Sequence, residues 1–162
     1  MNILLDTHIA LWAIVKPEKL SKKALELLCD NSNDLYVSIV LVWEVAIKHS
    51  IHPDKIPMSE FEYVDFCGMS GFNIFQLKVE HVLTLHTLSE NVSKSKEHKD
   101  PFDRIMIAQA KSEGFSLLTD DEKVSAYNED CIIYQEGSRK TAQNGSTGTA
   151  AQANNFATNN LQ

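Results

Sequence analysis

Short apolar runs alternate with helical segments along residues 1–134, and this alternation restricts the fold more than any other feature of the sequence. The apolar runs predict strands at 2–5, 35–38, 72–77, 115–118 and 131–134. The segments between them predict helices at about 7–16, 22–28, 39–48, 59–69, 79–88, 101–113 and 122–127. Strands that alternate with helices form mainly parallel sheets covered by helices on both faces. The sequence therefore predicts an α/β protein with a mainly parallel central sheet of about five strands.

The composition changes near residue 137. The chain of 162 residues is 43% hydrophobic and 23% charged, which suits one globular domain with a sizeable core. After Glu136, small and polar residues dominate, and Phe156 is the one aromatic residue of this segment. Such a segment cannot bury enough apolar surface to fold alone. We therefore expect one folded domain at 1–136 and a disordered tail at 137–162.

Cysteine usage and the N-terminal sequence favour a soluble cytoplasmic protein. Cys29, Cys67 and Cys131 are widely spaced, odd in number and free of any CxxC pair, which suits a reducing compartment better than a disulfide framework or a zinc site. The start of the chain lacks the basic segment of a secretory signal. Asp6 and His8 interrupt its apolar run, which is too short to span a bilayer. No membrane association is expected.

Three aspartates lie at the starts of predicted helices, where carboxylates have a common structural role. Asp6 stands between the first strand and the first helix, a usual position for a helix cap. Asp103 lies in the first turn of the helix at 101–113, where acids are favourable. Thr119 and Glu122, on either side of Asp121, fit a capping box. Taken singly, each aspartate is better explained by a helix start than by a functional site.

Glu44 lies in a predicted helix that is apolar almost all round, which indicates that the helix is largely buried. Lys48 follows four residues later, so an ion pair along the helix is the simplest explanation of this acid. The neighbours Val40, Leu41 and Val45 are apolar, and a carboxylate among such side chains needs a partner.

The four acids become more informative when they are placed on the predicted sheet. Asp6 follows the first strand and Asp121 follows the fourth. Glu44 lies within two turns of the start of the helix after the second strand, and Asp103 lies in the first turn of a returning helix. The carboxyl ends of parallel strands share one edge with the N-termini of these helices, and ligands usually bind there. We therefore expect all four carboxylates at that edge.

Carboxylates gathered at one edge raise each other's pKa and cannot all stay ionised without compensation. Mg²⁺ or Mn²⁺ would supply it, because these hard cations prefer carboxylate and water oxygens. Such a site can activate water and stabilise an in-line displacement at phosphorus. The net charge of −7 argues against a general nucleic-acid coat protein. Basic residues do gather locally, at Lys94, Lys96, His98 and Lys99.

Four stretches of the chain carry a family resemblance. They are LLDTHIALWAI at 4–14, VSIVLVWEVAIK at 37–48, HKDPFDRIMIAQA at 98–110 and LLTDDEKVSAY at 117–127. In content and order they resemble the PIN-domain nucleases, and especially the VapC-type toxins of bacterial toxin–antitoxin pairs. The resemblance covers most of residues 1–134. It implies a PIN-like three-layer α/β/α fold.

The resemblance also implies roles for particular residues. Five correspond to the catalytic group of the family: Asp6, Glu44, Asp103, Asp121 and Thr119. The four acids would hold Mg²⁺ or Mn²⁺, and the threonine would position metal-bound water. Four others are expected to support this group or to contact substrate: Thr7, His98, Asp100 and Arg104. Family members hydrolyse RNA, often tRNA or rRNA, commonly form homodimers, and are silenced by a cognate antitoxin protein.

Several alternatives stay open at this point. Asp120 and Asp121 are adjacent, so either could be the metal ligand that follows the fourth strand. Asp121 is favoured by its place in a Thr-x-Asp pattern. HAD-type phosphatases need a second aspartate where His8 stands, and receiver domains need paired acids that Asp6 and its neighbours do not supply. A PIN-like module could bind RNA or a partner without cutting. A PIN nuclease could also serve RNA processing instead of growth arrest.

Overall fold

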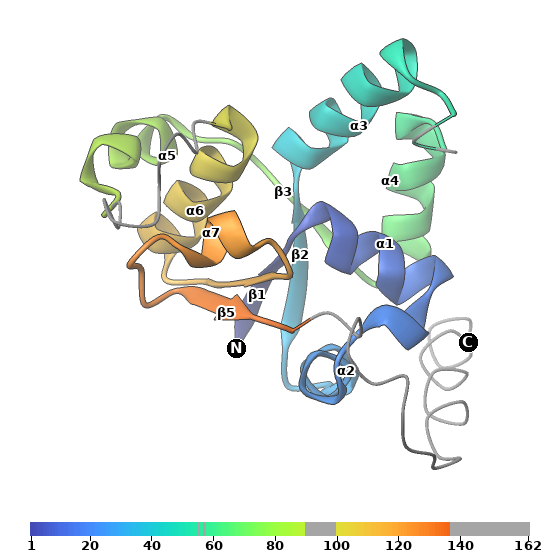
Figure 1. Cartoon of the computed structure of the whole chain (residues 1–162), viewed down its shortest axis with the longest axis horizontal. Coiled ribbons are helices and arrows are strands. Elements are labelled where there is room, and N and C mark those ends of the chain that lie inside the picture. Colours follow the sequence, from blue (N-terminus) through green and yellow to red (C-terminus); the bar gives the residue numbers. More distant parts are fainter. Residues whose placement is uncertain (55, 57, 90–99, 137–162) are drawn as a thin grey trace.

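A five-stranded sheet organises the part of the chain that the computed structural model describes, residues 1–54, 56, 58–89 and 100–136 (Figure 1). Its strands are β1 (Asn2–Leu5), β2 (Asp34–Ser38), β3 (Asn73–Phe75), β4 (Ser116–Thr119) and β5 (Ile132–Tyr134). They lie in the order β3-β2-β1-β4-β5, and every neighbouring pair is parallel. The expected α/β fold with about five strands is confirmed. His98 and the expected tail at 137–162 lie outside the described residues.

Helices connect the strands in turn. Those before β3 are α1 (Thr7–Val15), the 3-10 helix η1 (Pro17–Lys19), α2 (Lys22–Cys29), α3 (Ile39–Ile51) and α4 (Glu60–Met69). Those after β3 are α5 (Val79–Thr84), the 3-10 helix η2 (Leu85–Thr87), α6 (Pro101–Glu113) and α7 (Glu122–Ser125). The chain builds outward from β1 to β3 and then returns to β4 on the other side of β1. The direction of winding therefore reverses between β1 and β4, and the carboxyl ends of two such strands form the usual ligand site of an open α/β sheet.

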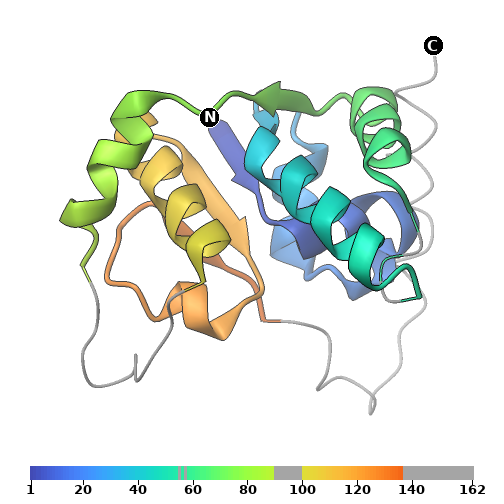
Figure 2. The same ribbon diagram turned by 90° about the horizontal axis from the view of Figure 1, so that it is seen from above.

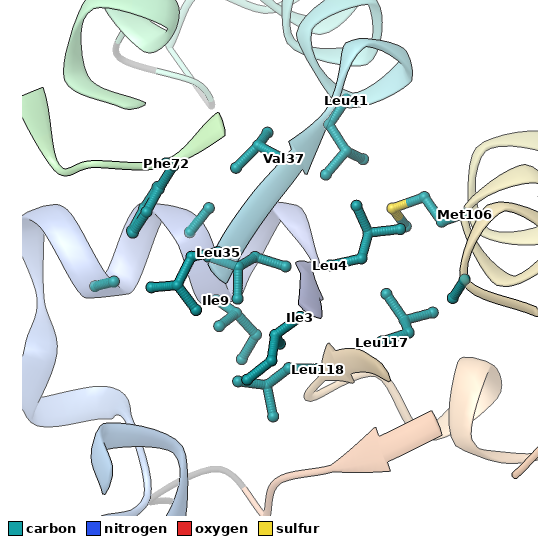
Figure 3. Packing of buried hydrophobic residues seen from close by; sticks show 14 of the residues in the cluster. Ile3, Leu4, Ile9, Leu35, Val37, Leu41, Phe72, Met106, Leu117 and Leu118 are labelled. Carbon is teal, nitrogen blue, oxygen red and sulfur yellow. The ribbon is translucent and has the colours of Figure 1, made fainter. Parts of the chain in front are cut away.

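Buried side chains cover both faces of the sheet and confirm the three layers. Figure 3 shows Ile9 of α1 on one side and Met106 of α6 on the other, with strand residues between them. Leu4 and Leu117 are register partners, are fully buried and lie toward α6. At the two sides of the molecule, α5 packs with α6 and α3 packs with α4 (Figure 2). The core therefore packs β1 and β4, neighbouring strands inside the sheet, between two layers of helices.

Some elements differ from the sequence-based expectation. The helix at 39–51 is buried on one side only, because Trp43 and Ile51 are 61% and 62% exposed. The strand expected at 72–77 is limited to Asn73–Phe75, an edge strand that pairs with β2 alone. The helix expected at 79–88 ends at Thr84 and continues as a 3-10 turn. Apolar content predicted these elements, but it did not predict which of their sides have a neighbour.

Gly114 ends α6 in the left-handed region, at φ 67° and ψ 29°, and its N–H donates to the Ala110 carbonyl. We expect Gly114→Ala to lower the free energy of unfolding by about 1–2 kcal/mol, since a Cβ strains this backbone conformation. A Cβ at that position meets nothing within 4 Å, so no clash should add to the loss. Unfolding in urea measures the effect.

Gly68 is the matched control for this substitution, because it lies inside α4 and a Cβ there also meets nothing within 4 Å. Gly68→Ala should raise stability by roughly 0.5–1 kcal/mol, as expected for alanine in a helix interior. Equal effects at the two glycines would contradict the assignment of strain to Gly114.

Candidate active site

Asp6 lies where β1 ends, beside the end of β4. Its backbone N–H donates to the Leu118 carbonyl at 3.0 Å, so the residue continues the pairing of the two strands. The residue is only 6% exposed. Its Oδ1 accepts a hydrogen bond from the Thr7 N–H at 2.5 Å, and its Oδ2 accepts one from the Thr119 hydroxyl at 2.5 Å. The helix-cap role and a position at the sheet edge therefore apply together.

Thr119 connects Asp6 to Asp121. Its hydroxyl is fully buried, donates to Asp6 and accepts from the Asp121 N–H at 3.0 Å. Asp121 is half-buried and caps α7 itself, because its Oδ1 accepts from the Lys123 N–H at 2.7 Å. The expected capping box of Thr119 with Glu122 is therefore wrong. Thr119 still belongs to β4, and its hydroxyl binds across the sheet edge.

Glu44 joins the same group through Thr7. The Thr7 hydroxyl donates to Glu44 Oε2 at 3.1 Å, while its backbone N–H donates to Asp6. Glu44 is 8% exposed, and its other oxygen, Oε1, pairs with the Lys48 ammonium. The glutamate is therefore both a buried carboxylate and half of an i,i+4 ion pair. The hydrogen bonds thus link three of the four predicted acids.

Asp103 lies half-buried in the first turn of α6. The preceding residue, Phe102, packs edge-on against Trp43 with ring centroids 5.2 Å apart, which places this turn beside α3. Asp100 is exposed and caps α6, accepting from the Phe102 N–H at 2.9 Å. Arg104 is half-buried in the same turn. The structure thus places Asp103 in a turn of α6 that packs beside α3, the helix of Glu44, and Asp100 has a structural role in the cap.

A buried hydrogen bond that the sequence gave no reason to expect fixes α3 against α6. The Ser38 hydroxyl donates to Gln109 Oε1 at 2.6 Å, and both residues are fully buried. The same hydroxyl accepts from the Val40 N–H and so caps α3. This pair sets the spacing between the helix that carries Glu44 and the helix that carries Asp103.

The surroundings of Asp6 disfavour its negative charge. Burial is the largest effect and raises the pKa of the Asp6 carboxyl, and the nearby Asp120 raises it further. The hydrogen bond from Thr119 and the proximity of His8 oppose this rise in pKa. A carboxylate in this situation is stabilised by a bound cation.

Residues 3–130 match the family model described as the PIN domain. The chain belongs to the PIN domain family. No curated protein matches it. Among solved structures it is similar to VapBC2 from Rickettsia felis bound to a DNA fragment from their promoter, with 20% sequence identity and a TM-score of 0.59. That match covers 85% of this chain and 99% of the other, and it supports the fold.

PIN domains are generally nucleases that use divalent metal ions. In this PIN domain, Asp6, Glu44 and Asp121 offer the oxygen donors that Mg²⁺ and Mn²⁺ prefer. Within the described residues, however, no three His, Cys, Asp or Glu side chains are grouped as a metal ion would need. Lys48 already neutralises one oxygen of Glu44. The carboxylate oxygens of these acids are therefore of the chemical type that binds Mg²⁺ or Mn²⁺, while Glu44 is held in an ion pair with Lys48.

The sequence pattern pointed to no role at the site for two basic residues near the acids, His8 and Lys48. His8 lies 3.6 Å from Asp120, and its ring stacks on Trp12. Lys48 was considered only as an ion-pair partner, but it also acts on the charge of His8. The sequence signal was present, since His8 lies two residues after Asp6 and Lys48 one turn after Glu44.

None of the helices in the described ranges is long and apolar enough to cross a membrane. All three cysteines are free, with Cys67 buried, Cys131 half-buried and Cys29 exposed. Burial raises the pKa of the Cys67 thiol to about 11, so this thiol is unreactive.

Proposed function

We propose that this PIN domain is a metal-dependent endoribonuclease that hydrolyses phosphodiester bonds of RNA, with tRNA or rRNA as its substrate. The observation that carries the proposal is the hydrogen-bonded group in which Thr7 joins the carboxylates of Asp6 and Glu44, and Thr119 joins the Asp6 carboxylate to the backbone N–H of Asp121. It lies at the carboxyl ends of β1 and β4, where the sheet changes its direction of winding. Membership of a family whose members are generally nucleases supports the same reaction.

Mg²⁺ or Mn²⁺ would be held by Asp6, Glu44, Asp103 and Asp121, and would supply activation of water and stabilisation of charge at phosphorus. The protein's own contribution is to fix the carboxylates. One donor holds each oxygen of Asp6, so this carboxylate has a single orientation. Thr7 likewise fixes Glu44 Oε2, which ties the orientation of α3 to that of α1. Groups held in this way lose little freedom when the substrate binds.

We further propose that the enzyme is the toxin of a type II toxin–antitoxin pair, works in the cytoplasm, forms a homodimer and is silenced by a cognate antitoxin. Its similarity in fold to a protein of VapBC2 supports this role. Partner proteins usually cover exposed apolar surface. In the described chain, such side chains include two on α3, two on α4 and three on α5: Trp43, Ile51, Phe61, Met69, Val79, Val82 and Leu83.

Cleavage by the purified chain, free of any partner, tests the reaction. Bulk tRNA and rRNA are incubated with Mn²⁺, with Mg²⁺ or with EDTA, and the fragments are separated and their ends mapped. We expect discrete fragments with 5′-phosphate and 3′-hydroxyl ends in the two metal samples alone. Intact RNA in the presence of Mn²⁺ would refute the nuclease proposal.

One observation favours a second candidate, a PIN-like module that binds RNA without cutting it. Lys48 holds Glu44 in an ion pair, as in a site that needs no metal. The same assay separates the two, because a binding module retains RNA in a filter-binding measurement and leaves it uncut.

Expression in a bacterial host tests the biological role separately from the chemistry. A toxin should arrest growth, and co-expression of a small DNA-binding protein encoded just upstream should restore it. Cleavage in vitro without growth arrest would instead indicate an enzyme of RNA processing.

A further inference from the structure

Two neighbours hold the side chain of His8 in place. Its Nδ1 lies 3.6 Å from Asp120 Oδ1. Its ring stacks on that of Trp12, with centroids 5.7 Å apart and an interplanar angle of 18°. The side chain is nevertheless 63% exposed. The imidazole is therefore oriented by the protein and open to a ligand.

Asp120 is suited to orienting this histidine. Its side chain is 11% exposed, and its Oδ1 is buried without a hydrogen-bond partner in the described part of the chain. A buried carboxylate oxygen needs a compensating charge. The His8 imidazole, with Nδ1 3.6 Å from this oxygen, is placed to supply it. The adjacent acid, Asp121, has different contacts, because it caps α7 and binds Thr119.

The position of His8 matters because the protein as a whole repels RNA. Its net charge is −7, and the reacting phosphate must approach a group of carboxylates. His8 lies close enough to Asp6 and Lys48 for both to act on its charge. Lys19 is a further basic residue here, with its Nζ 5.2 Å from the centre of the Trp12 ring. His8 and Lys19 therefore both lie against the same indole ring.

We infer that His8 binds a phosphate of the RNA backbone next to the bond that is cut, and that Asp120 is its positioning residue and not a further metal ligand. The inference rests on the proposed nuclease function. With Nδ1 facing Asp120, Nε2 donates a hydrogen bond to a phosphate oxygen, and Trp12 keeps the ring in that orientation. A charge-assisted hydrogen bond of this kind contributes to binding at the edge of the site.

Steady-state cleavage of bulk tRNA with Mn²⁺ tests the inference. His8→Gln should raise KM about tenfold and change kcat less than about twofold, as expected when one charged hydrogen bond to substrate is lost. His8→Arg, which also offers hydrogen-bond donors to a phosphate, should keep KM close to the wild-type value. Asp120→Asn should raise KM in the same direction by a smaller factor. His52→Gln and Asp130→Asn change an exposed histidine and an exposed acid elsewhere, and should match the wild type.

A different pattern would overturn the inference. If Asp120→Asn abolishes kcat or raises the Mn²⁺ concentration needed for activity, while His8→Gln leaves KM unchanged, Asp120 is a metal ligand. Binding of bulk tRNA in EDTA provides a readout without cleavage. There, His8→Gln should weaken binding about tenfold, as expected when one hydrogen bond to a phosphate is lost, while His52→Gln should bind like the wild type.

This second readout keeps the inference separate from the proposed function. A wild-type protein that fails to cut RNA refutes the nuclease proposal, and binding then decides the role of His8 alone. An affinity of His8→Gln for tRNA equal to that of the wild type would refute the phosphate contact.

Discussion

Asp6→Asn is expected to reduce RNA cleavage to the level of the EDTA control while the protein stays folded. Asparagine keeps the size of the side chain and its ability to cap α1, since it is as good a helix cap as aspartate. Its Oδ1 can still accept from the Thr7 N–H, and its Nδ2 meets the Thr119 hydroxyl as a donor in place of an acceptor, but it lacks the negative charge that would hold a divalent cation. Cleavage of tRNA in Mn²⁺ measures the loss.

The stability of the same variant distinguishes a functional from a structural cause. Burial raises the pKa of Asp6, so between the unfolded and folded pKa values the folded state binds more protons than the unfolded state. The stability of the metal-free wild type therefore falls as the pH rises through that interval. Asparagine does not titrate, so Asp6→Asn should lack this fall and be at least as stable as the wild type at pH 7.

Urea unfolding of both proteins in EDTA, from pH 4 to pH 8, tests the sign of this effect. Functional sites commonly lower stability in this way, and their removal commonly raises it. A variant that is inactive because it is unfolded, or one that cuts RNA as fast as the wild type, would contradict the role given to Asp6.

The sequence predicted the parts of this protein that depend on the order of elements. The end of β1 at Leu5, just before Asp6, and the start of α6 at Pro101 follow from apolar runs and helix-start residues. The parallel sheet follows from their alternation. Once the strands are parallel, the carboxyl ends of β1 and β4 meet at one edge, and so do Asp6 and Thr119. This is why residues 113 positions apart form a hydrogen bond that could be anticipated in outline.

The sequence did not predict which partner each side chain of the site contacts. Glu44 was expected either to be buried or to pair with Lys48, and in the structure it does both. Adjacent acids such as Asp120 and Asp121 look equivalent in the sequence, yet one faces His8 and the other caps α7. Such choices depend on side-chain directions at the end of a strand, which change by a wide angle from one residue to the next. A pattern of residue types does not record those directions.

Thr119→Val is expected to have the second largest effect, on activity and stability together. Valine has nearly the shape of threonine but no hydroxyl, so it leaves Asp6 Oδ2 without its donor and the Asp121 N–H without its acceptor. Buried polar groups that lose a partner reduce stability by about 1–3 kcal/mol. Since this hydrogen bond lowers the pKa of Asp6, its removal should raise that pKa further. Loss of a partner that orients a metal-binding carboxylate typically reduces activity about 10–100-fold.

Thr119→Ser is the matched control, because it keeps the hydroxyl and removes only the methyl group. If the hydroxyl matters, the serine variant should retain most of the activity, while the valine variant loses both activity and stability. If the methyl group matters instead, serine should be the weaker of the two in urea unfolding, because Thr119 is fully buried. If the Thr119→Val variant cuts RNA as fast as the wild type, Asp6 keeps its orientation without the Thr119 hydroxyl. The hydrogen-bonded group would then be a structural feature of the sheet edge. The ratio of the two cleavage rates therefore measures how much of the site's activity depends on one hydroxyl at the end of β4.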